Sequence, residues 1–186
     1  MCELLGMSAN VPTDIVFSFT GLVERGGVTG PHKDGWGITF YDGKGCRCFK
    51  DPLPSCESQV ADLIKSYPIK SEVVISHIRQ ANRGEVNLEN THPFTRELWG
   101  QNWCYAHNGQ LSDYENHLTT SRFNPVGQTD SELAFCWILD KLAAKFDAMP
   151  EDTSLIFDFI RGLGDELKAF GVFNMLLSNG DYLIAY

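Results

Sequence analysis

Cys2 directly follows the initiator methionine and could combine the two groups that an N-terminal nucleophile requires. Removal of Met1 would leave a thiol and a free α-amine on one residue. An unperturbed thiol has a pKa of about 8.5 and an α-amine one of about 7.7–8.0, so a neutral amine can take the thiol proton near pH 7, directly or through water. Cys2 is therefore a candidate nucleophile with its own base. The alternative is a small apolar residue at the start of a strand.

Three later segments place polar residues at the ends of expected strands or ahead of a helix. Arg79 follows the β-branched run 73–75, so it lies at a strand end where a side chain can face a pocket. Asn108 and Gly109 end a second short strand. Their Asn-Gly step either closes a hairpin or presents a side-chain amide and a backbone N–H to one point. Asp130 precedes an amphipathic stretch and could supply an anion.

In their order and spacing these motifs resemble class II glutamine amidotransferase domains, which belong to the N-terminal nucleophile hydrolase superfamily. The matching motifs are the cysteine at position 2, H-x-R-x-A-x-x-G at 77–84, H-N-G at 107–109 and T-D-S-E at 129–132. The opening C-E-L-L-G and the segment K-D-G-W-G-I narrow the resemblance to the stand-alone YafJ-like branch, GATase type 4. The resemblance covers essentially the whole chain. One short motif is weak, but several in order are a strong signal.

The resemblance implies an enzyme that hydrolyses the side-chain amide of L-glutamine to glutamate and ammonia. Cys2 would attack the amide and form a thioester, while Asn108 and Gly109 would form the oxyanion hole. Arg79 would bind the α-carboxylate of glutamine, and Asp130 would pair with its α-ammonium. A zwitterionic substrate needs one fixed cation and one fixed anion, which these two positions supply.

Simpler interpretations remain open for two of these residues. Arg79 could be a surface ion-pair residue. Asp130 could cap the helix that begins near it, because Asp or Thr ahead of an apolar periodic stretch is a usual N-cap signature. Asp130 could also do both. His77 and His92 are interpreted as structural histidines.

The loop after Arg79 departs from the pattern of many relatives and leaves the substrate open. Gln80, Asn82 and Arg83 stand where many relatives have Trp, Thr and His. The wall around the substrate can therefore differ in shape and charge, and a γ-glutamyl amide or peptide is an alternative substrate. A non-catalytic glutamine-binding domain is a further alternative, although it would have no use for an oxyanion hole. In the leading interpretation ammonia passes to a separate synthase partner or is released.

Composition and charge exclude several other classes. The formal net charge is −9 and no basic run is present, which argues against binding to nucleic acid or an anionic membrane surface. No apolar stretch approaches the roughly 20 residues of a membrane span, so the protein is expected in the cytoplasm. Cys46, Cys48 and Cys56 lack a second C-x-x-C pair or a nearby histidine, so neither a metal nor another cofactor is expected.

The pattern of elements predicts an α+β fold with mainly antiparallel sheets and helices outside, since strands, helices and strands follow one another in blocks. The resemblance sharpens this to a four-layer α/β/β/α sandwich. One domain is expected over residues 1–186, with a C-terminal portion missing, and the polar stretch 84–100 is interpreted as a lid. The expected helices are 14–24, 58–66, 131–146 and 154–169, and the expected strands are 2–7, 36–41, 46–50, 72–78, 102–106, 172–177 and 182–186.

Overall fold

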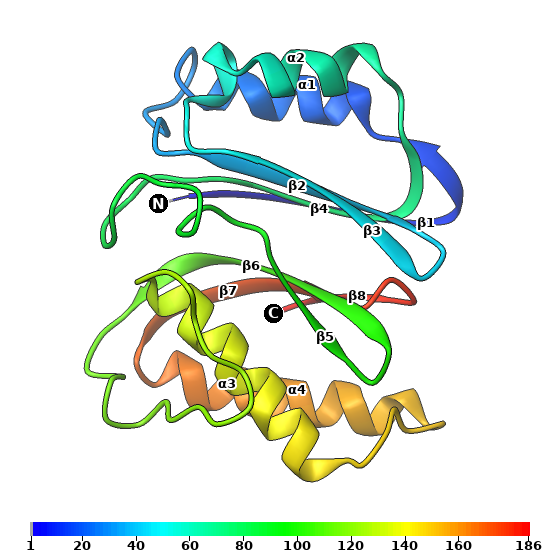
Figure 1. The fold of residues 1–186 in the computed structure, drawn as a ribbon, viewed down its shortest axis with the longest axis vertical. Helices are drawn as coiled ribbons and strands as arrows, with labels where there is room; N and C mark the ends of the chain where they lie inside the picture. Colours follow the sequence, from blue (N-terminus) through cyan, green and yellow to red (C-terminus); the bar gives the residue numbers. More distant parts are fainter. Residues whose placement is uncertain (1) are drawn as a thin grey trace.

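Two four-stranded sheets face each other in the computed structural model, which describes residues 2–186. Helices cover the outer face of each sheet (Figure 1). On one side lie α1 (Val16–Arg25) and α2 (Gln59–Ser66), and on the other lie α3 (Asp130–Lys145) and α4 (Thr153–Lys168). The layers therefore follow the order α/β/β/α, which confirms the predicted sandwich.

The first sheet brings the start of the chain next to the segment that contains Arg79. Its strands follow the order β1-β4-β2-β3 and are all antiparallel neighbours. Glu3 of β1 lies opposite Ile78 of β4, so Cys2 sits where β4 ends. Two motifs far apart in sequence thus meet through strand register alone. The strands are β1 (Glu3–Asp14), β2 (Trp36–Asp42), β3 (Gly45–Asp51) and β4 (Lys70–Ile78), with a short 3-10 helix, η1, at Ser55–Glu57.

The second sheet carries the Asn-Gly motif on its longest strand. The order is β5-β6-β7-β8, again antiparallel throughout. Asn108 and Gly109 lie within β6 and pair with Asn174 and Phe173 of β7, so the Asn-Gly step does not close a hairpin. The strands are β5 (Phe94–Leu98), β6 (Gln101–Leu111), β7 (Gly171–Ser178) and β8 (Leu183–Ala185).

The predicted lid over residues 84–100 is wrong. Residues 94–98 form β5, which pairs with β6, and Asn90, Thr91 and His92 ahead of it are buried. Only five residues long and with polar Thr, Arg and Glu in its middle, β5 lacks the apolar alternation that identifies a strand. β5 is therefore identified by its pairing with β6, and no pattern within its own residues indicates a strand.

The core alternates along β6 in the two-residue period of a strand. Trp103 and Tyr105 pack toward the α3 and α4 layer, whereas Cys104 and Ala106 pack against Val73 and Ile75 of the first sheet. The same period places His107 on the helix side of β6 and the next residue on the side of the first sheet. β6 therefore carries polar side chains on both faces of the second sheet.

Helix boundaries fall within two residues of the predicted ones, with side-chain caps at three starts. Ser58, Thr129 and Asp152 each accept a hydrogen bond from a backbone N–H in the first turn of the helix that follows. β1 is longer than predicted and runs to Asp14, so α1 begins only at Val16. Asp130 is the first helical residue and Thr129 is the cap, which corrects the suggestion that Asp130 caps this helix.

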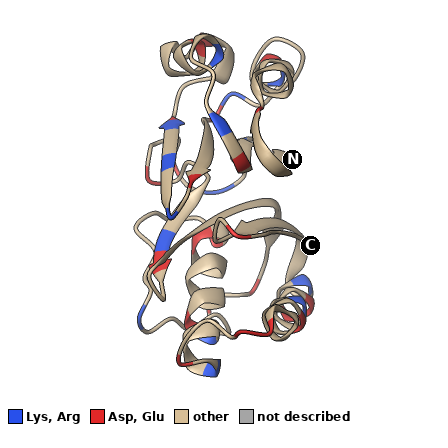
Figure 2. Ribbon diagram, turned by 90° about the vertical axis from the view of Figure 1, so that its right-hand side faces the viewer, with Lys and Arg blue, Asp and Glu red and all other residues tan. Residues whose placement is uncertain are grey.

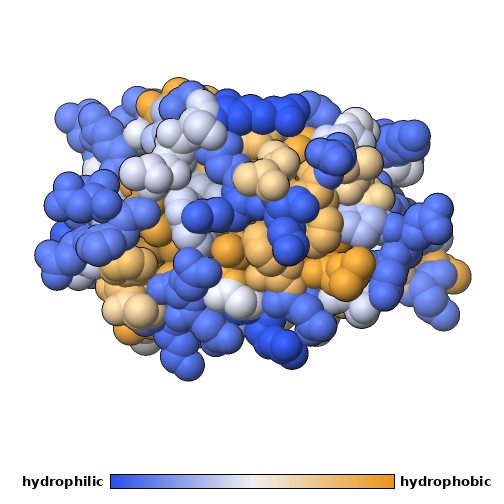
Figure 3. Space-filling model, turned by 90° about the horizontal axis from the view of Figure 1, so that it is seen from below, coloured by the Kyte–Doolittle hydropathy of each residue, from blue (hydrophilic) through white to orange (hydrophobic). Residues whose placement is uncertain are grey.

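Charged and apolar residues are mixed over the surface of the described residues. Lys and Arg occur on the same elements as Asp and Glu (Figure 2). The outer face of the α3 and α4 layer shows apolar side chains among hydrophilic ones (Figure 3), and Leu155 and Phe157 of α4 are exposed. No helix in residues 2–186 has the length and apolar character needed to cross a membrane.

Tyr41 joins the two sheets at the end of the sandwich far from Cys2. Its hydroxyl lies 2.8 Å from the Asn102 carbonyl and 2.9 Å from the Ser178 carbonyl, so a residue of β2 donates to the second sheet. We expect Tyr41→Phe to lower the free energy of unfolding by about 1 kcal/mol, because a buried neutral hydrogen bond is lost. Urea denaturation measures this change.

Tyr182→Phe is the matched control for this measurement. Among residues 2–186 the Tyr182 hydroxyl has one hydrogen-bond partner, the sulfur of Met149 at 3.9 Å, and sulfur is a weak acceptor. Its unfolding midpoint should stay close to that of the unmodified protein. Equal losses for the two variants would contradict a special role for Tyr41 in holding the sheets together.

Candidate active site

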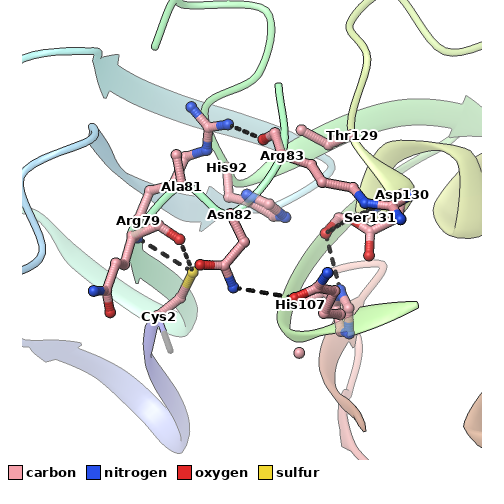
Figure 4. Close-up of a pocket in the computed structure, with 13 residues that line it drawn as sticks. Cys2, Arg79, Ala81, Asn82, Arg83, His92, His107, Thr129, Asp130 and Ser131 are labelled. Atoms are coloured by element: carbon pink, nitrogen blue, oxygen red, sulfur yellow. Dashed lines mark hydrogen bonds between the residues drawn. The ribbon is translucent and has the colours of Figure 1, made fainter. Parts of the chain in front are cut away.

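A pocket lies where the start of β1, the end of β4, β6 and the start of α3 converge (Figure 4). The pocket is partly open to solvent, and its inner space is about 30 Å³, which holds only one or two water molecules. Side chains at the rim would therefore have to move for the pocket to surround an amino acid. The lining residues are Cys2, Arg79, Gln80, Ala81, Asn82, Arg83, His92, His107, Gly109, Gln110, Thr129, Asp130 and Ser131.

Four of the five predicted site residues line this pocket, and the fifth lies beside it. Cys2, Arg79, Gly109 and Asp130 are in the lining, whereas Asn108 is not. Asn108 is half-buried, and the period of β6 turns its side chain toward the first sheet. Among residues 2–186 its Oδ1 is buried and makes no hydrogen bond. Its amide is thus next to the pocket without being held by a neighbour.

The thiol of Cys2 is fixed by the backbone of Gln80. The Gln80 N–H donates to Sγ at 3.4 Å, and the thiol lies 3.5 Å from the Gln80 carbonyl. Burial raises the pKa of the thiol, while the Gln80 hydrogen bond and the charge of Arg79 act in the opposite direction. The thiol therefore needs a base to become a nucleophile at neutral pH. The predicted removal of Met1, which would supply that base, lies outside the described residues.

Arg79 is a buried cation that organises its own loop. It is 3% exposed, and its guanidinium donates to the carbonyls of Arg83, Gly84 and Glu85 at 2.8, 3.3 and 2.9 Å. No carboxylate in residues 2–186 forms an ion pair with it. Burial lowers the pKa of Arg79, while Cys2, Asp34 and Asp130 nearby act in the opposite direction. The structure thus corrects the suggestion of a surface ion-pair residue.

Gly84 allows the loop to wrap around this guanidinium. Its φ is 74°, in the left-handed region that favours glycine. A Cβ at this position would lie 3.1 Å from Nδ2 of Asn90 and 3.4 Å from Nη2 of Arg79. Asp34 holds the other end of the loop by accepting the Ala81 N–H at 2.7 Å. The segment after β4 is therefore anchored on both sides of the pocket.

Asp130 connects the second sheet to the start of α3. One carboxylate oxygen accepts the Leu111 N–H at 2.8 Å, and the other accepts the Ser131 N–H at 2.9 Å. Asp130 is 7% exposed and lines the pocket. Both oxygens still have lone pairs free, because a carboxylate accepts about four hydrogen bonds. Asp130 can therefore hold the fold and bind a cation at once.

Gly109 is required by the close approach of β7. A Cβ on Gly109 would collide with the carbonyl of Val172 and lie 2.6 Å from Nε2 of His107. Any larger residue would push β6 and β7 apart. The backbone of β6 therefore faces the pocket at this position without a side chain in the way.

His107 is committed to structure on both ring nitrogens. Nε2 lies 3.3 Å from the Val172 carbonyl, which can only accept, so Nε2 carries the proton. Nδ1 is then the acceptor for the hydroxyl of Ser131, at 2.9 Å. Burial lowers the pKa of His107, which keeps the ring neutral. This tautomer, assigned from the hydrogen bonds, leaves His107 no nitrogen for proton transfer to Cys2.

His77 and His92 form a buried stacked pair at the pocket, and His92 belongs to its lining. Their ring centroids are 4.2 Å apart with 30° between the planes, and His92 also packs on Phe94 at 4.4 Å. Among the residues described here, none of the four ring nitrogens makes a hydrogen bond of good geometry. Burial lowers the pKa of His77 to about 3 and that of His92 well below its ordinary value. Both rings are therefore neutral, as expected of structural histidines.

The rim of the pocket contains Asn82 and Arg83, which the sequence indicated only as departures from the loop pattern of many relatives. Nδ2 of Asn82 lies 3.5 Å from Oε1 of Gln110, which links the loop to β6. Arg83 extends from the loop toward the Asp130 side of the pocket (Figure 4). Gln110 has no sequence signal of its own, because an exposed polar residue near a strand end is common.

The chemistry available here is nucleophilic attack on a small zwitterionic molecule. Four different groups line one pocket. They are the thiol of Cys2, the buried guanidinium of Arg79, the carboxylate of Asp130 and the backbone of Gly109, which has no side chain. No group of three or more His, Cys, Asp or Glu in residues 2–186 is arranged to hold a metal ion. The donor set favours attack by sulfur, with charge recognition of the ends of the substrate.

Comparison with known proteins connects this site to one family. Residues 1–186 match the family model described as glutamine amidotransferases class-II. YafJ of Escherichia coli strain K12 is 68% identical over 186 residues, which is all of this chain and 72% of that protein. A relative from Haemophilus influenzae is 50% identical over 186 residues, which is 63% of its length. Both relatives are longer than this chain.

Solved structures agree with the sequence comparison. The crystal structure of a predicted glutamine amidotransferase from Pseudomonas aeruginosa has 51% identity and a TM-score of 0.77, covering 100% of this chain and 72% of that one. The allosteric regulatory enzyme of purine biosynthesis has a TM-score of 0.67 at 21% identity, covering 100% of this chain and 37% of that one. These neighbours confirm the predicted N-terminal nucleophile hydrolase fold.

The buried histidine pair makes stability depend on pH below neutrality. The pKa of His77 falls from 6.5 to about 3 on folding. The folded state therefore has its full stability above pH 6.5, where the ring is neutral in both states. It loses stability as the pH falls toward 3, because the unfolded state takes up the proton first. We expect the free energy of unfolding to decrease by about 1.4 kcal/mol per pH unit for each such histidine. Urea denaturation at several pH values measures the slope.

His92→Phe tests the assignment of this slope. Phenylalanine keeps the stack on His77 and Phe94 but cannot take up a proton. The slope between pH 6 and 4 should therefore fall by about one proton relative to the unmodified protein. An unchanged slope would mean that other groups cause the acid sensitivity.

Proposed function

The chain belongs to the class II glutamine amidotransferase family, and on this premise we propose that it hydrolyses the side-chain amide of L-glutamine through a thioester on Cys2. The products are glutamate and ammonia. The observation that carries the proposal is the convergence of Cys2, Gly109, Arg79 and Asp130 on one pocket from four separate parts of the chain.

The first step in this proposal is deprotonation of a buried thiol. Burial raises the pKa of Cys2, and His107 has no free nitrogen, so the base must come from elsewhere. The α-amine freed by removal of Met1 has the right pKa, since an α-amine titrates at about 7.7–8.0. The thiolate adds to the amide carbon, the amide nitrogen takes the proton and leaves as ammonia, and water then hydrolyses the thioester.

Stabilisation of the tetrahedral intermediate is assigned to the Asn-Gly step of β6. Gly109 lines the pocket and would supply its backbone N–H, and the period of β6 directs the Asn108 side-chain amide toward the first sheet. Two such donors aimed at a developing oxyanion lower the barrier because they are in place before the reaction. The unbonded Oδ1 of Asn108 supports a side chain free to orient toward Cys2.

Recognition of the substrate is assigned to Arg79 and Asp130. Among residues 2–186 the buried guanidinium of Arg79 has no carboxylate partner, so a substrate carboxylate would complete an ion pair that these residues do not supply. Asp130 keeps acceptor capacity for the α-ammonium. The two charges discriminate an α-amino acid from a simple amide.

Two finer points belong to the same proposal. Ammonia is released or passes to a separate synthase partner, and the protein works in the cytoplasm, where thiols stay reduced. A γ-glutamyl amide or peptide is the second candidate substrate, because the polar and partly exposed rim of Gln80, Asn82 and Arg83 can accommodate a larger amine portion. Relative rates on L-glutamine and γ-glutamyl dipeptides separate the two.

Intact mass and ammonia release test the central claim together. We expect protein lacking Met1 to release ammonia from L-glutamine, and 6-diazo-5-oxo-L-norleucine to add once, on Cys2, and abolish turnover. Cys2→Ala should reduce turnover to background. Processed protein that shows neither turnover nor an adduct would contradict glutamine hydrolysis by this chain.

Asn108→Ala tests the oxyanion assignment. Loss of one such donor costs about 2.7–4 kcal/mol at the transition state, so kcat should fall roughly 100- to 1,000-fold. Asn174→Ala is the matched control, because this amide lies opposite on β7 and donates to the Asn108 carbonyl at 2.9 Å. The control should keep kcat within about threefold of the unmodified protein, as surface substitutions usually do. Similar losses in both variants would point to strand disruption.

A further inference from the structure

Two arginines line the pocket, and they are held in opposite ways. Arg79 is buried at its floor, whereas Arg83 lies at the rim with 41% of its side chain exposed. In Figure 4 the Arg79 guanidinium turns toward the loop backbone, while the Arg83 side chain extends across to the Asp130 side. The site thus contains one fixed and one adjustable cation.

The fixed cation has much of its hydrogen-bonding capacity in use. Both terminal nitrogens of Arg79 donate to carbonyls of the loop, at 2.8 to 3.3 Å. A guanidinium has five N–H donors, and these bonds take up at least two of them. Its charge reaches the pocket, but both terminal nitrogens already hold loop carbonyls, so the guanidinium cannot turn around a carboxylate without breaking these bonds.

The adjustable cation is only weakly held where it is. Nη1 of Arg83 lies 3.5 Å from the Tyr114 hydroxyl and 3.4 Å from Oε1 of Glu115, and the guanidinium sits 5.8 Å from the Tyr114 ring centroid. Both distances exceed those of a strong charge-assisted hydrogen bond. The Glu115 side chain is 60% exposed, so water competes for the pair. An anion that binds the Arg83 guanidinium more strongly can therefore replace its contacts with Tyr114 and Glu115.

The two arginines are also connected through the backbone. The carbonyl of Arg83 accepts from Nη2 of Arg79 at 2.8 Å, the shortest hydrogen bond of that guanidinium. Arg79 therefore fixes the backbone position of Arg83, from which the Arg83 side chain extends. The hydrogen bond to the Tyr114 hydroxyl is the main cause that raises the pKa of Arg83, and the charges of Glu115 and Asp130 add smaller contributions in the same direction.

We propose that Arg83 is a substrate-binding residue, whose guanidinium leaves Tyr114 and Glu115 and binds the α-carboxylate of the substrate from the rim while Arg79 attracts it from the floor. This role rests on the proposed function, because it concerns the carboxylate of a glutamine or γ-glutamyl group. It also explains how a pocket of about 30 Å³ can admit such a molecule, since Arg83 is part of its rim. The simpler alternative is that Arg83 only ties the loop to Tyr114.

Protection of Cys2 from alkylation separates these two roles without relying on turnover. The protein is treated with iodoacetamide, and modification of Cys2 is followed by mass spectrometry of the N-terminal peptide. Protection by L-glutamate is compared with protection by L-isoglutamine, in which the α-carboxylate is a neutral carboxamide. The ratio of the two dissociation constants reports recognition of the α-carboxylate alone.

Arg83→Gln should weaken binding of L-glutamate about tenfold, as expected for one charge-assisted hydrogen bond at a partly exposed site. Binding of L-isoglutamine should not change. Arg83→Lys should keep part of the preference, and added salt should weaken glutamate binding less in Arg83→Gln than in the unmodified protein. Arg122→Gln is the matched control, because Arg122 is another exposed arginine on an aromatic ring, 5.2 Å from the Phe123 centroid, outside the pocket. It should leave both constants unchanged.

An equal preference for glutamate in Arg83→Gln and in the unmodified protein would overturn the proposal, as would equal losses for both ligands. Ammonia release from L-glutamine is measured on the same samples. A lost carboxylate preference without any turnover in the unmodified protein would support Arg83 and reject glutamine hydrolysis. Normal turnover with an unchanged preference would do the reverse.

Discussion

The site depends on the antiparallel register between β1 and β4. Because Glu3 lies opposite Ile78, the residue before β1 must lie beside the residues after β4. The backbone of Gln80 then holds the thiol of Cys2 through both its N–H and its carbonyl. A slip of one residue would turn every side chain of β1 to the other face of the sheet and remove the Cys2 thiol from the pocket.

The half of the site on the second sheet and α3 is ordered by buried polar contacts. Asp130 fixes the start of α3 to the end of β6, and Asn90 accepts the Gln128 N–H at 2.8 Å. Glu132, which is 2% exposed, pairs with Arg96 at 2.6 Å. Each of these groups would be costly if left unpaired, so the loops around the pocket have few alternative arrangements.

The sequence predicts the fold class and the sandwich, and the candidate site residues stand out because they sit in short local motifs. Cys2, Arg79, Gly109 and Asp130 line one pocket, and their roles there stay predictions. What local patterns could not supply was tertiary information. β5 is recognised as a strand only because it pairs with β6. The environment of Arg79 depends on the path of residues 83–85, whose carbonyls accept its hydrogen bonds. The offset of Asn108 from the lining likewise follows from strand pairing.

The close contact between Gly109 and Val172 determines where this enzyme scaffold can change over evolutionary time. Any side chain at Gly109 requires a compensating shift of β7, so a single substitution there is blocked. Gln80, Asn82 and Arg83 are partly or fully exposed and can be replaced one at a time. Substitutions can therefore accumulate in the loop at the rim of the pocket, while the paired strands behind it stay as they are.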